Sequence, residues 1–490
     1  MLKIIERFTN EPEWRAKVFD ETAVAQWKTV TLARKAFRNI SDKAFDFCIA
    51  ELCDKAGKNV DIDSVAVLDT ELAVIKSDDL ISEELRQELI EGVKVLENYE
   101  EWRPSPSNMV LDLVDPSLYS LMYGRSRVLP NKTISVENCL QHCGKGGIIR
   151  APPYSGSGGN RHWSRKFQWL PSEVGFTDDG VKVLSYINNL HPKTHANLYT
   201  VAEKYIAKAV PIWNQVLSNF GLADHGRSLR IYPRSFSGRR PEPMEYSEWM
   251  PVNLTSMNLR EKFPQGLQVI VQLVNIHLTP ENPRYEGGQN RVEGMLNEHI
   301  CSTLLYDYDC ENITASYLEF YQMISHDALE EVIENMCDSK CTSRLYDGRA
   351  IGFPNVQQHR ITPFKLAGRT KPGHRKILAL FLVDPSQRVL STANVPPQQR
   401  DWWAQAVRME RTGKLSQLPA ELFNNVMENV DFPSSLTEAK TQREESRTER
   451  KGHERSVDSR LTFSAKNSRP PARYFPEAAQ ESMSFLTEVN

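Results

Sequence analysis

Apolar residues follow two different periods along this chain, and the change of period separates a helical first part from a strand-rich second part. In the first part, apolar side chains recur three or four positions apart, which predicts amphipathic helices. Leu85, Leu89 and Val93, for example, form one stripe, with Ser82 as a plausible N-cap. The predicted helices cover 11–57, 81–98 and 191–221, the last closing at Gly221.

The second part contains short runs rich in β-branched and aromatic residues, such as "LQVIVQLVNIHL", each bounded by turn residues. The predicted strands are 267–278, 302–308, 348–354 and 375–385. Regular helices do not alternate with these runs, so a sandwich or jelly roll is favoured over a doubly wound parallel sheet. We therefore predict an α+β fold with a jelly-roll core and with N-terminal and flanking helices.

Composition shifts suggest four regions. The segment 143–163 is dense in Gly, Pro and Ser and predicts a long loop. Beyond about 433 the chain is strongly charged and then rich in Ser and Pro, which predicts a solvated helix followed by disorder. The regions are an N-terminal helical region (1–100), a loop-rich connecting region (101–190), the core (191–432) and a charged tail (433–490).

Composition excludes several classes of partner. The chain has 490 residues, of which 40% are hydrophobic and 25% charged, and its formal net charge is −3. Such a balance creates no field that would gather nucleic acid or an anionic membrane surface. No apolar run approaches the roughly 20 residues that span a bilayer, and the start lacks a signal-peptide core. Eight cysteines in so long a chain without a signal predict reduced thiols and a cytoplasmic location.

The stretch "YEGGQNRVEGMLNEHI" (285–300) contains candidate metal-binding residues. Non-haem iron oxygenases hold Fe(II) with two histidines and one carboxylate, and leave positions for cosubstrate and oxygen. Glu293 is a candidate carboxylate ligand, and His359, 66 residues later, is a candidate distal histidine. Arg375 opens a hydrophobic strand, and its guanidinium is suited to clamp the far carboxylate of 2-oxoglutarate.

The first histidine of such a site is missing, because Arg291 stands in its place. A guanidinium has no lone pair to give a metal. On a strand, Arg291 and Glu293 would point to the same face, with Cα atoms about 6.6 Å apart. We therefore predict that Arg291 pairs with Glu293 and fills the site.

Two other histidines are candidate replacement ligands. His299 lies six residues beyond Glu293, roughly 20 Å away on a continuous strand, so it needs a turn of the chain to approach. His277, on the strand before the Gly-Gly turn, could lie opposite Glu293 in an antiparallel pair.

Each of these residues also has a simpler structural interpretation. Glu293 and Arg291 could form a surface ion pair, His359 could cap a turn, and Arg375 could be a solvated charge. A separate possibility is a structural zinc site made of four thiolates. Its ligands would be Cys139, Cys143, Cys337 and Cys341.

Long segments between about 60 and 435 resemble the fungal domain-of-unknown-function 4246 family. They include "VLDLVDPSLYSLMYGRSRVLP", "NIHLTPENPRYEGG", "GRAIGFPNVQQHR" and "KPGHRKILALFLVDPSQRVLSTANVPPQQR". This family is similar to iron/2-oxoglutarate oxygenases, which implies a double-stranded β-helix core. The resemblance implies Glu293 and His359 as metal ligands and Arg375 as the cosubstrate arginine. The family's usual Gly-Gly-Ser-Trp-His-Val-Glu-Gly is "GGQNRVEG" here, so Arg291 replaces the first-ligand histidine.

Three functions are consistent with these observations. The first is an iron/2-oxoglutarate oxygenase-like protein tied to oxidation of a small molecule, of the kind found in fungal secondary metabolism. It would need Fe(II) and 2-oxoglutarate. The second is a pseudoenzyme on the same scaffold that binds a ligand or a protein without turnover. The third is an interaction protein built around structural zinc.

Overall fold

The structure, a computed structural model, describes ten ranges of the chain. They are 1–37, 40–57, 65–69, 73–97, 109–151, 163–219, 249, 256–321, 340–410 and 413–464.

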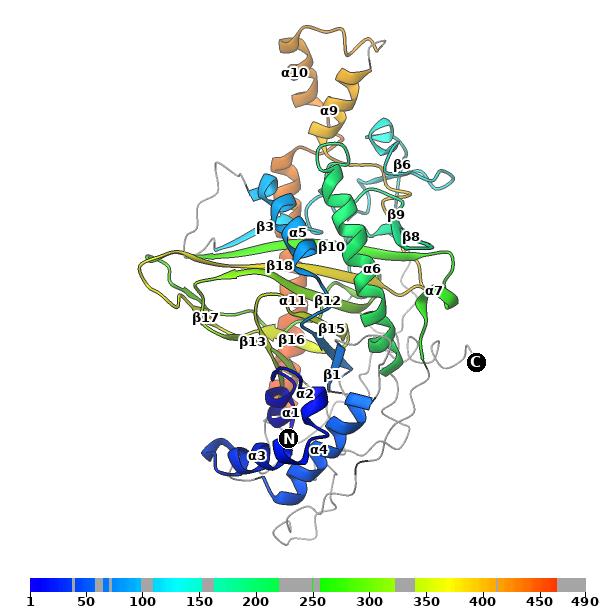
Figure 1. Ribbon diagram of the computed structural model, residues 1–490. Coiled ribbons are helices and arrows are strands. Elements are labelled where there is room, and N and C mark those ends of the chain that lie inside the picture. The colour runs from blue at the N-terminus through cyan, green and yellow to red at the C-terminus, as the bar shows by residue number, and fades with distance from the viewer. Residues whose placement is uncertain are drawn as a thin grey trace.

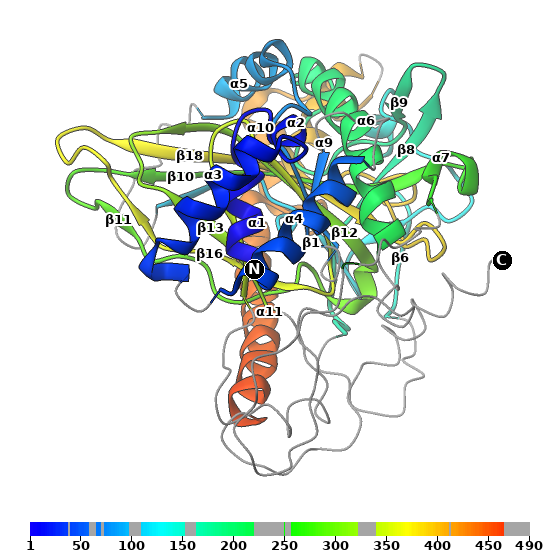
Figure 2. The ribbon, with the colours of Figure 1, turned by 60° about the horizontal axis from the view of Figure 1, so that its bottom comes forward.

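The N-terminal part is a group of short helices with its own apolar core. Figures 1 and 2 show these helices together at the end of the molecule that carries the N-terminus. The long helical segment predicted for 11–57 is divided into several helices. A polar cap starts one of them, α3, where the Asp20 side chain accepts from Thr22 N at 2.9 Å. The elements are α1 (Leu2–Phe8), α2 (Trp14–Lys17), α3 (Glu21–Leu32), η1 (Lys35–Phe37) and α4 (Asp42–Gly57).

The centre of the molecule is a nine-stranded sheet, here called the main sheet. Its pairings are antiparallel, and the predicted strands β10, β12, β15 and β18 are all confirmed. The N-terminal and connecting regions also contribute strands to it, which the sequence did not predict. In spatial order the strands are β1 (Val65–Asp69), β2 (Val74–Ser77), β15 (Ala350–Pro354), β12 (Ile300–Glu311), β18 (Gly373–Val383), β10 (Leu267–Leu278), β8 (Ser172–Thr177) and β9 (Gly180–Val183), with β3 (Val110–Val114) also paired to β10.

Alternation along the central strands gives the main sheet two apolar faces. In β18, Leu378, Leu380 and Leu382 belong to the largest core, which includes residues of two long helices. The intervening Ala379 and Phe381 belong to a different cluster on the opposite face. We call the first the helix face and the second the inner face.

The helix face is covered by α5 (Glu83–Glu97) and α6 (Ala196–Asn219), which lie in front of the main sheet in Figure 1. Both helices were predicted, and each begins a few residues later than the sequence suggested. The predicted end of the second helix, at Gly221, lies outside the described residues.

The inner face is covered by smaller antiparallel sheets. Leu318 and Phe320 of one of them pack on Phe353 of the main sheet. The sheets are β14–β13–β16, made of β14 (Lys340–Leu345), β13 (Ser316–Tyr321) and β16 (Gln358–Ile361), and β11–β17, made of β11 (Arg284–Tyr285) and β17 (Phe364–Lys365). The fold is thus a mixture of helices and antiparallel sheets, as predicted; a double-stranded β-helix stays a prediction.

The C-terminal part is helical. Figure 1 shows α9 and α10 projecting from one end, while α11 passes behind the main sheet. No helix in the described ranges is long and apolar enough to cross a membrane. The bounds are α9 (Arg400–Met409), α10 (Ala420–Asn429) and α11 (Leu436–Ser464); the remaining short elements are β4 (Leu121–Met122), β5 (Arg127–Val128), β6 (Gly147–Ile148), β7 (Phe167–Gln168), η2 (Cys139–His142), η4 (Leu296–Glu298) and α7 (Leu259–Lys262).

Candidate functional site

The Gly-Gly turn brings the segment with Arg291 beside β16. Gly287 has φ +89°, and a Cβ there would lie 2.8 Å from Ile361 O, so this position favours glycine. The next residue, Gly288, donates its N–H to the same carbonyl at 2.9 Å. Arg291 and His359 then exchange two backbone hydrogen bonds of 3.0 Å each. A single bridge, rather than the predicted strand, therefore aligns the two residues.

Three side chains meet at this bridge. Arg291 Nε donates to Glu293 Oε1 at 2.8 Å, and His359 Nε2 lies 3.2 Å from the same oxygen. The Glu293 side chain is 7% exposed, His359 is buried, and the Arg291 side chain is 42% exposed. The predicted Arg291–Glu293 pair is confirmed, and it includes the histidine proposed as a metal ligand.

The surroundings hold the carboxylate and the imidazole in place. Asn355 binds the backbone of Glu293 twice: its Oδ1 accepts from Glu293 N at 3.0 Å and its Nδ2 donates to Glu293 O at 2.7 Å. The His359 ring packs on Phe353, with ring centroids 4.7 Å apart. Its Nδ1 lies 3.3 Å from Gln357 O, so both ring nitrogens face oxygen acceptors.

Burial and the neighbouring cation act in opposite directions on the pKa of Glu293. Burial by itself would raise the pKa of Glu293, but the Arg291 charge and the contact with His359 outweigh it and lower the pKa to about 2. Glu293 is therefore an ionised carboxylate whose charge is balanced by a guanidinium rather than by a cation from solution.

Arg375, the candidate cosubstrate arginine, already holds a carboxylate. Its Nε and one terminal nitrogen donate to the two oxygens of Asp307 at 2.8 and 2.7 Å, and the other donates to Ser316 Oγ at 2.8 Å. Arg375 and Asp307 are both almost fully buried. This forked geometry is the one expected for 2-oxoglutarate, with an internal carboxylate in its place.

Tyr285 lies near both arginine pairs. Burial raises the pKa of Tyr285, while Arg291 and Arg375 both act to lower it, so the phenol lies within electrostatic reach of both guanidiniums. Phe364 lies beside Tyr285, with centroids 5.1 Å apart, and 5.9 Å from the Arg375 guanidinium carbon. Both pairs thus belong to one region on the inner face.

His277, the first candidate replacement ligand, projects from the helix face. It lies opposite His374, with ring centroids 6.1 Å apart, and burial lowers its pKa to about 4. A register shift between Asp307 and Asp309 places these two acids on opposite faces of the main sheet. Asp307 lies on the inner face, whereas Asp309 contacts His374 on the helix face at 3.0 Å. The structure therefore separates His277 from Glu293 by the main sheet.

His299, the second candidate, adopts a left-handed conformation (φ 49°) at the end of η4. Its ring packs edge-on against Trp163, with centroids 5.9 Å apart. No described contact joins His299 to Glu293 or His359.

These donors do not fit iron with 2-oxoglutarate. Glu293 and His359 supply two ligands, whereas the facial site needs three. The described residues contain no group of three or more His, Cys, Asp or Glu side chains arranged to hold a metal. The guanidinium beside Glu293 cannot be the third, and Arg375 is engaged by Asp307.

The predicted zinc site can be followed only in part. Cys139 and Cys143 are buried free thiols near η2, and burial raises the pKa of Cys139 to about 12, which disfavours the thiolate that zinc requires. Cys341 lies in β14, and Cys337 lies outside the described residues.

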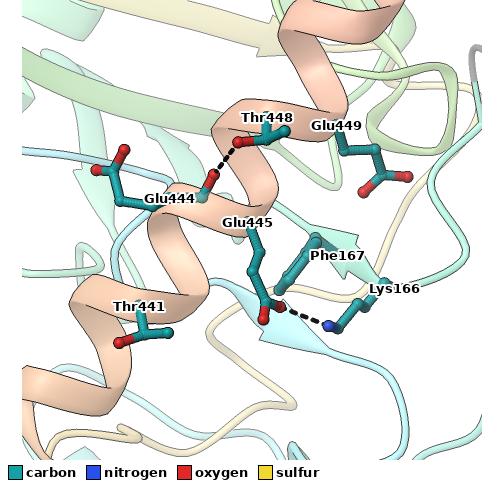
Figure 3. Close-up of a pocket in the computed structure, with 7 residues that line it drawn as sticks. All are labelled: Lys166, Phe167, Thr441, Glu444, Glu445, Thr448 and Glu449. Carbon is teal, nitrogen blue, oxygen red and sulfur yellow. Dashed lines mark hydrogen bonds and ion pairs between the residues drawn. The ribbon is translucent and has the colours of Figure 1, made fainter.

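A hollow of about 690 Å³ lies elsewhere, between α11 and β7. Figure 3 shows Lys166 paired with Glu445 at its rim and Phe167 in its wall. Glu444 and Glu449 of α11 also line it. Its walls contain neither Glu293 nor His359, so it is separate from the predicted site.

Sequence reasoning missed the partners that define this region. Asp307 was passed over, although an acid inside the apolar run "STLLYDY" is a signal of a buried ion pair. Asn355 and Ser316 gave no signal, because their contacts join segments more than 50 residues apart.

Similarity to solved structures is distant. The dioxygenase TqaL, described as Fe(II)/(alpha)ketoglutarate-dependent, is 11% identical over 62% of this chain and 90% of its own, with a TM-score of 0.22. A bsmA homolog from Methylobium petroleophilum PM1 is 11% identical over 25% of this chain and 42% of its own, with a TM-score of 0.18. Hazelnut (Corylus avellana) vicilin is 11% identical over 36% and 38%, with a TM-score of 0.16.

This chain thus spans less than two thirds of the bsmA homolog and of the vicilin. Among curated proteins, none is similar enough to count as a match.

The family described as "Protein of unknown function (DUF4246)" matches residues 42–406, and its N-terminal domain matches residues 1–29. The chain belongs to this family.

Proposed function

We propose that this member of the DUF4246 family is a pseudoenzyme: an oxygenase-like scaffold, with a double-stranded β-helix core, that binds a small molecule or a protein without oxidising it. The observation that carries the proposal is the 2.8 Å pair between Arg291 and Glu293, with His359 on the same oxygen. A cation supplied by the chain itself occupies the electrostatic role that a metal would have.

The second arginine pair supports the same proposal. In an active oxygenase of this type, an arginine equivalent to Arg375 would be available to the cosubstrate. Here Asp307 accepts from both nitrogens of the Arg375 fork, and both residues are almost fully buried. Releasing Arg375 to 2-oxoglutarate would leave the Asp307 carboxylate buried and unpaired, which is costly.

The oxygenase alternative needs a third ligand. His277 projects from the far face of the main sheet, and His299 packs on Trp163, so neither favours that alternative.

Iron binding tests the proposal directly. Fe(II) and 2-oxoglutarate are titrated anaerobically into the natural protein, into Arg291→His, and into the matched control Arg291→Gln, which removes the cation without adding a ligand. We expect neither the natural protein nor the control to retain Fe(II), and Arg291→His to bind it at least tenfold more tightly, because it restores three donors.

Two outcomes would overturn the proposal. A visible iron–oxoglutarate band in the natural protein would mean that another group completes the site and that the protein is an oxygenase. Equal iron binding by the histidine and glutamine variants would mean that Glu293 and His359 are not the remainder of a metal site.

A further inference from the structure

Helix α11 begins 30 residues after the family match ends at residue 406, and it carries an unusual face. Arg443, Arg447 and Arg450 recur at spacings of four and three, which places them on one side of a helix. Ala439 and Ser446, on the same side, are buried. The charged segment predicted to be a solvated helix therefore has one face packed on the protein.

Arg450 makes the most enclosed contact of this face. Its two terminal nitrogens donate to the two oxygens of Glu298, at 2.9 and 2.5 Å, and its guanidinium carbon lies 4.1 Å from the centre of the Trp169 ring. The Glu298 side chain is 0% exposed. A fork on a carboxylate combined with stacking on an aromatic ring is specific for a guanidinium and would not be reproduced by lysine.

Arg447, one turn away, binds two further carboxylates. It donates to Asp112 at 2.6 Å and to Asp115 at 2.8 Å, and Asp115 is almost fully buried. Arg443 lies 3.7 Å from Asp115. We call Asp112, Asp115, Glu298 and Trp169 together the arginine site.

Among the described residues, every ion pair of the three carboxylates comes from α11. Without this helix, Glu298 and Asp115 would lose every cation that pairs with them among the described residues. The arginine site is therefore complementary in charge to a helix that carries arginines.

The contact is ionic more than apolar. Ala439 is the one hydrophobic residue of α11 counted as buried in the part of that helix whose side chains are described. The hollow in Figure 3 lies along the same helix, so α11 is not close-packed there. A helix held mainly by charged contacts, without a large apolar interface, can detach from the rest of the protein as a unit.

The arginine site also adjoins the segment that carries Glu293. Glu298 Oε2 accepts from Met295 N at 2.7 Å, and Glu298 Oε1 accepts from Trp169 N at 2.6 Å. A Cβ at Gly294 would lie 2.7 Å from the Glu298 carboxylate. Arg450 therefore holds, through Glu298, the turn that follows Glu293.

We propose that the arginine site is a docking site for a helix bearing arginines at the spacing of 443, 447 and 450. In this chain α11 occupies it reversibly and holds the segment 294–299 in place. A free helix of the same sequence binds when the chain's own helix has left. This docking is independent of whether the neighbouring site ever held iron.

Hydrogen exchange of the full chain, followed by mass spectrometry, tests the docking. We compare the natural protein with Arg447→Gln/Arg450→Gln and with the matched control Lys440→Gln/Lys451→Gln, which removes two exposed charges from the same helix. In the arginine variant we expect exchange at least tenfold faster in 436–452 and faster exchange in 294–299, with β10 unchanged. The lysine control should match the natural protein.

A second experiment uses a synthetic peptide of residues 436–464. Added to the arginine variant, it should slow exchange in 294–299 again, whereas a peptide with glutamine at 447 and 450 should not. Equal exchange in the two double variants, or a natural peptide that gives no protection, would overturn the proposal.

Faster exchange in β10 would show that the arginine variant has lost its core. In that case hydrogen exchange of the natural protein is measured at rising salt concentration, because salt weakens ionic docking. Exchange in 436–452 should rise between about 0.1 and 1 M salt while β10 stays constant. A helix α11 that exchanges as slowly as β10 at every salt concentration would be a permanent part of the core and would contradict the proposal.

Discussion

The two arginine–carboxylate pairs on the inner face differ in one decisive respect, which is access to water. Arg375 and Asp307 are 2% and 4% exposed at their side chains and share two hydrogen bonds, with a third to Ser316. Arg291 shares one hydrogen bond with Glu293 and is 42% exposed. The Arg375–Asp307 pair is a fixed part of the core, whereas Arg291 is a half-exposed cation that covers a buried carboxylate.

The largest expected effect comes from breaking the buried pair. Asp307→Ala leaves the Arg375 guanidinium without its counter-charge in a site closed to water, so we expect the free energy of unfolding to fall by about 3–5 kcal/mol. Urea denaturation followed by circular dichroism measures it. The double change Asp307→Leu/Arg375→Met should regain most of the loss, because it removes both charges. A single variant as stable as the natural protein would refute the contrast between the pairs.

The next effect is a pH dependence that belongs to Glu293. Its pKa is lowered from 4.5 to about 2, so the ionised carboxylate stabilises the folded state fully above pH 4.5, and this contribution is lost as the pH falls towards 2. By linkage the contribution is on the order of 3 kcal/mol. The stability difference between the natural protein and Glu293→Gln should therefore shrink from pH 5 towards pH 2. A difference independent of pH would contradict the lowered pKa.

The smallest effect is expected for the exposed partner. Arg291→Ala removes a half-exposed cation whose attraction is screened by water, and it leaves His359 beside the carboxylate. We therefore expect a loss of about 1 kcal/mol in the free energy of unfolding. The same urea titration measures it, with Arg284→Ala as a matched control for an exposed arginine beside a glutamate. A loss as large as that of Asp307→Ala would mean that Arg291 is as integral as Arg375.

The strands and helices nearest the site were largely predictable. β10 runs over Leu267–Leu278, as its apolar run predicts, and α5 and α6 follow from apolar residues at helical spacing. The pairing of Arg291 with Glu293 was also predictable, because two residues so close in sequence can meet whatever the wider fold. The sequence missed the strands of the connecting region, which are short and gain their stability from the strands they pair with, in the main sheet or in two small two-stranded sheets.

The remainder was decided by long-range contacts. Whether Arg375 is free for a cosubstrate depends on Asp307, 68 positions away, and whether His277 can reach Glu293 depends on the face of the main sheet from which it projects. The charged helix α11 looks solvated in sequence because arginine and glutamate alternate along it, yet its partners Asp112, Asp115 and Glu298 lie more than 140 residues earlier.

By itself, then, the sequence determined the family, the helices and strands with strong periodicity, and the pairing of Arg291 with the nearby Glu293. Only the tertiary structure decided which carboxylate each arginine holds. The physical reason is that periodicity and local spacing act within one element, whereas burial and charge pairing depend on which elements the fold brings together.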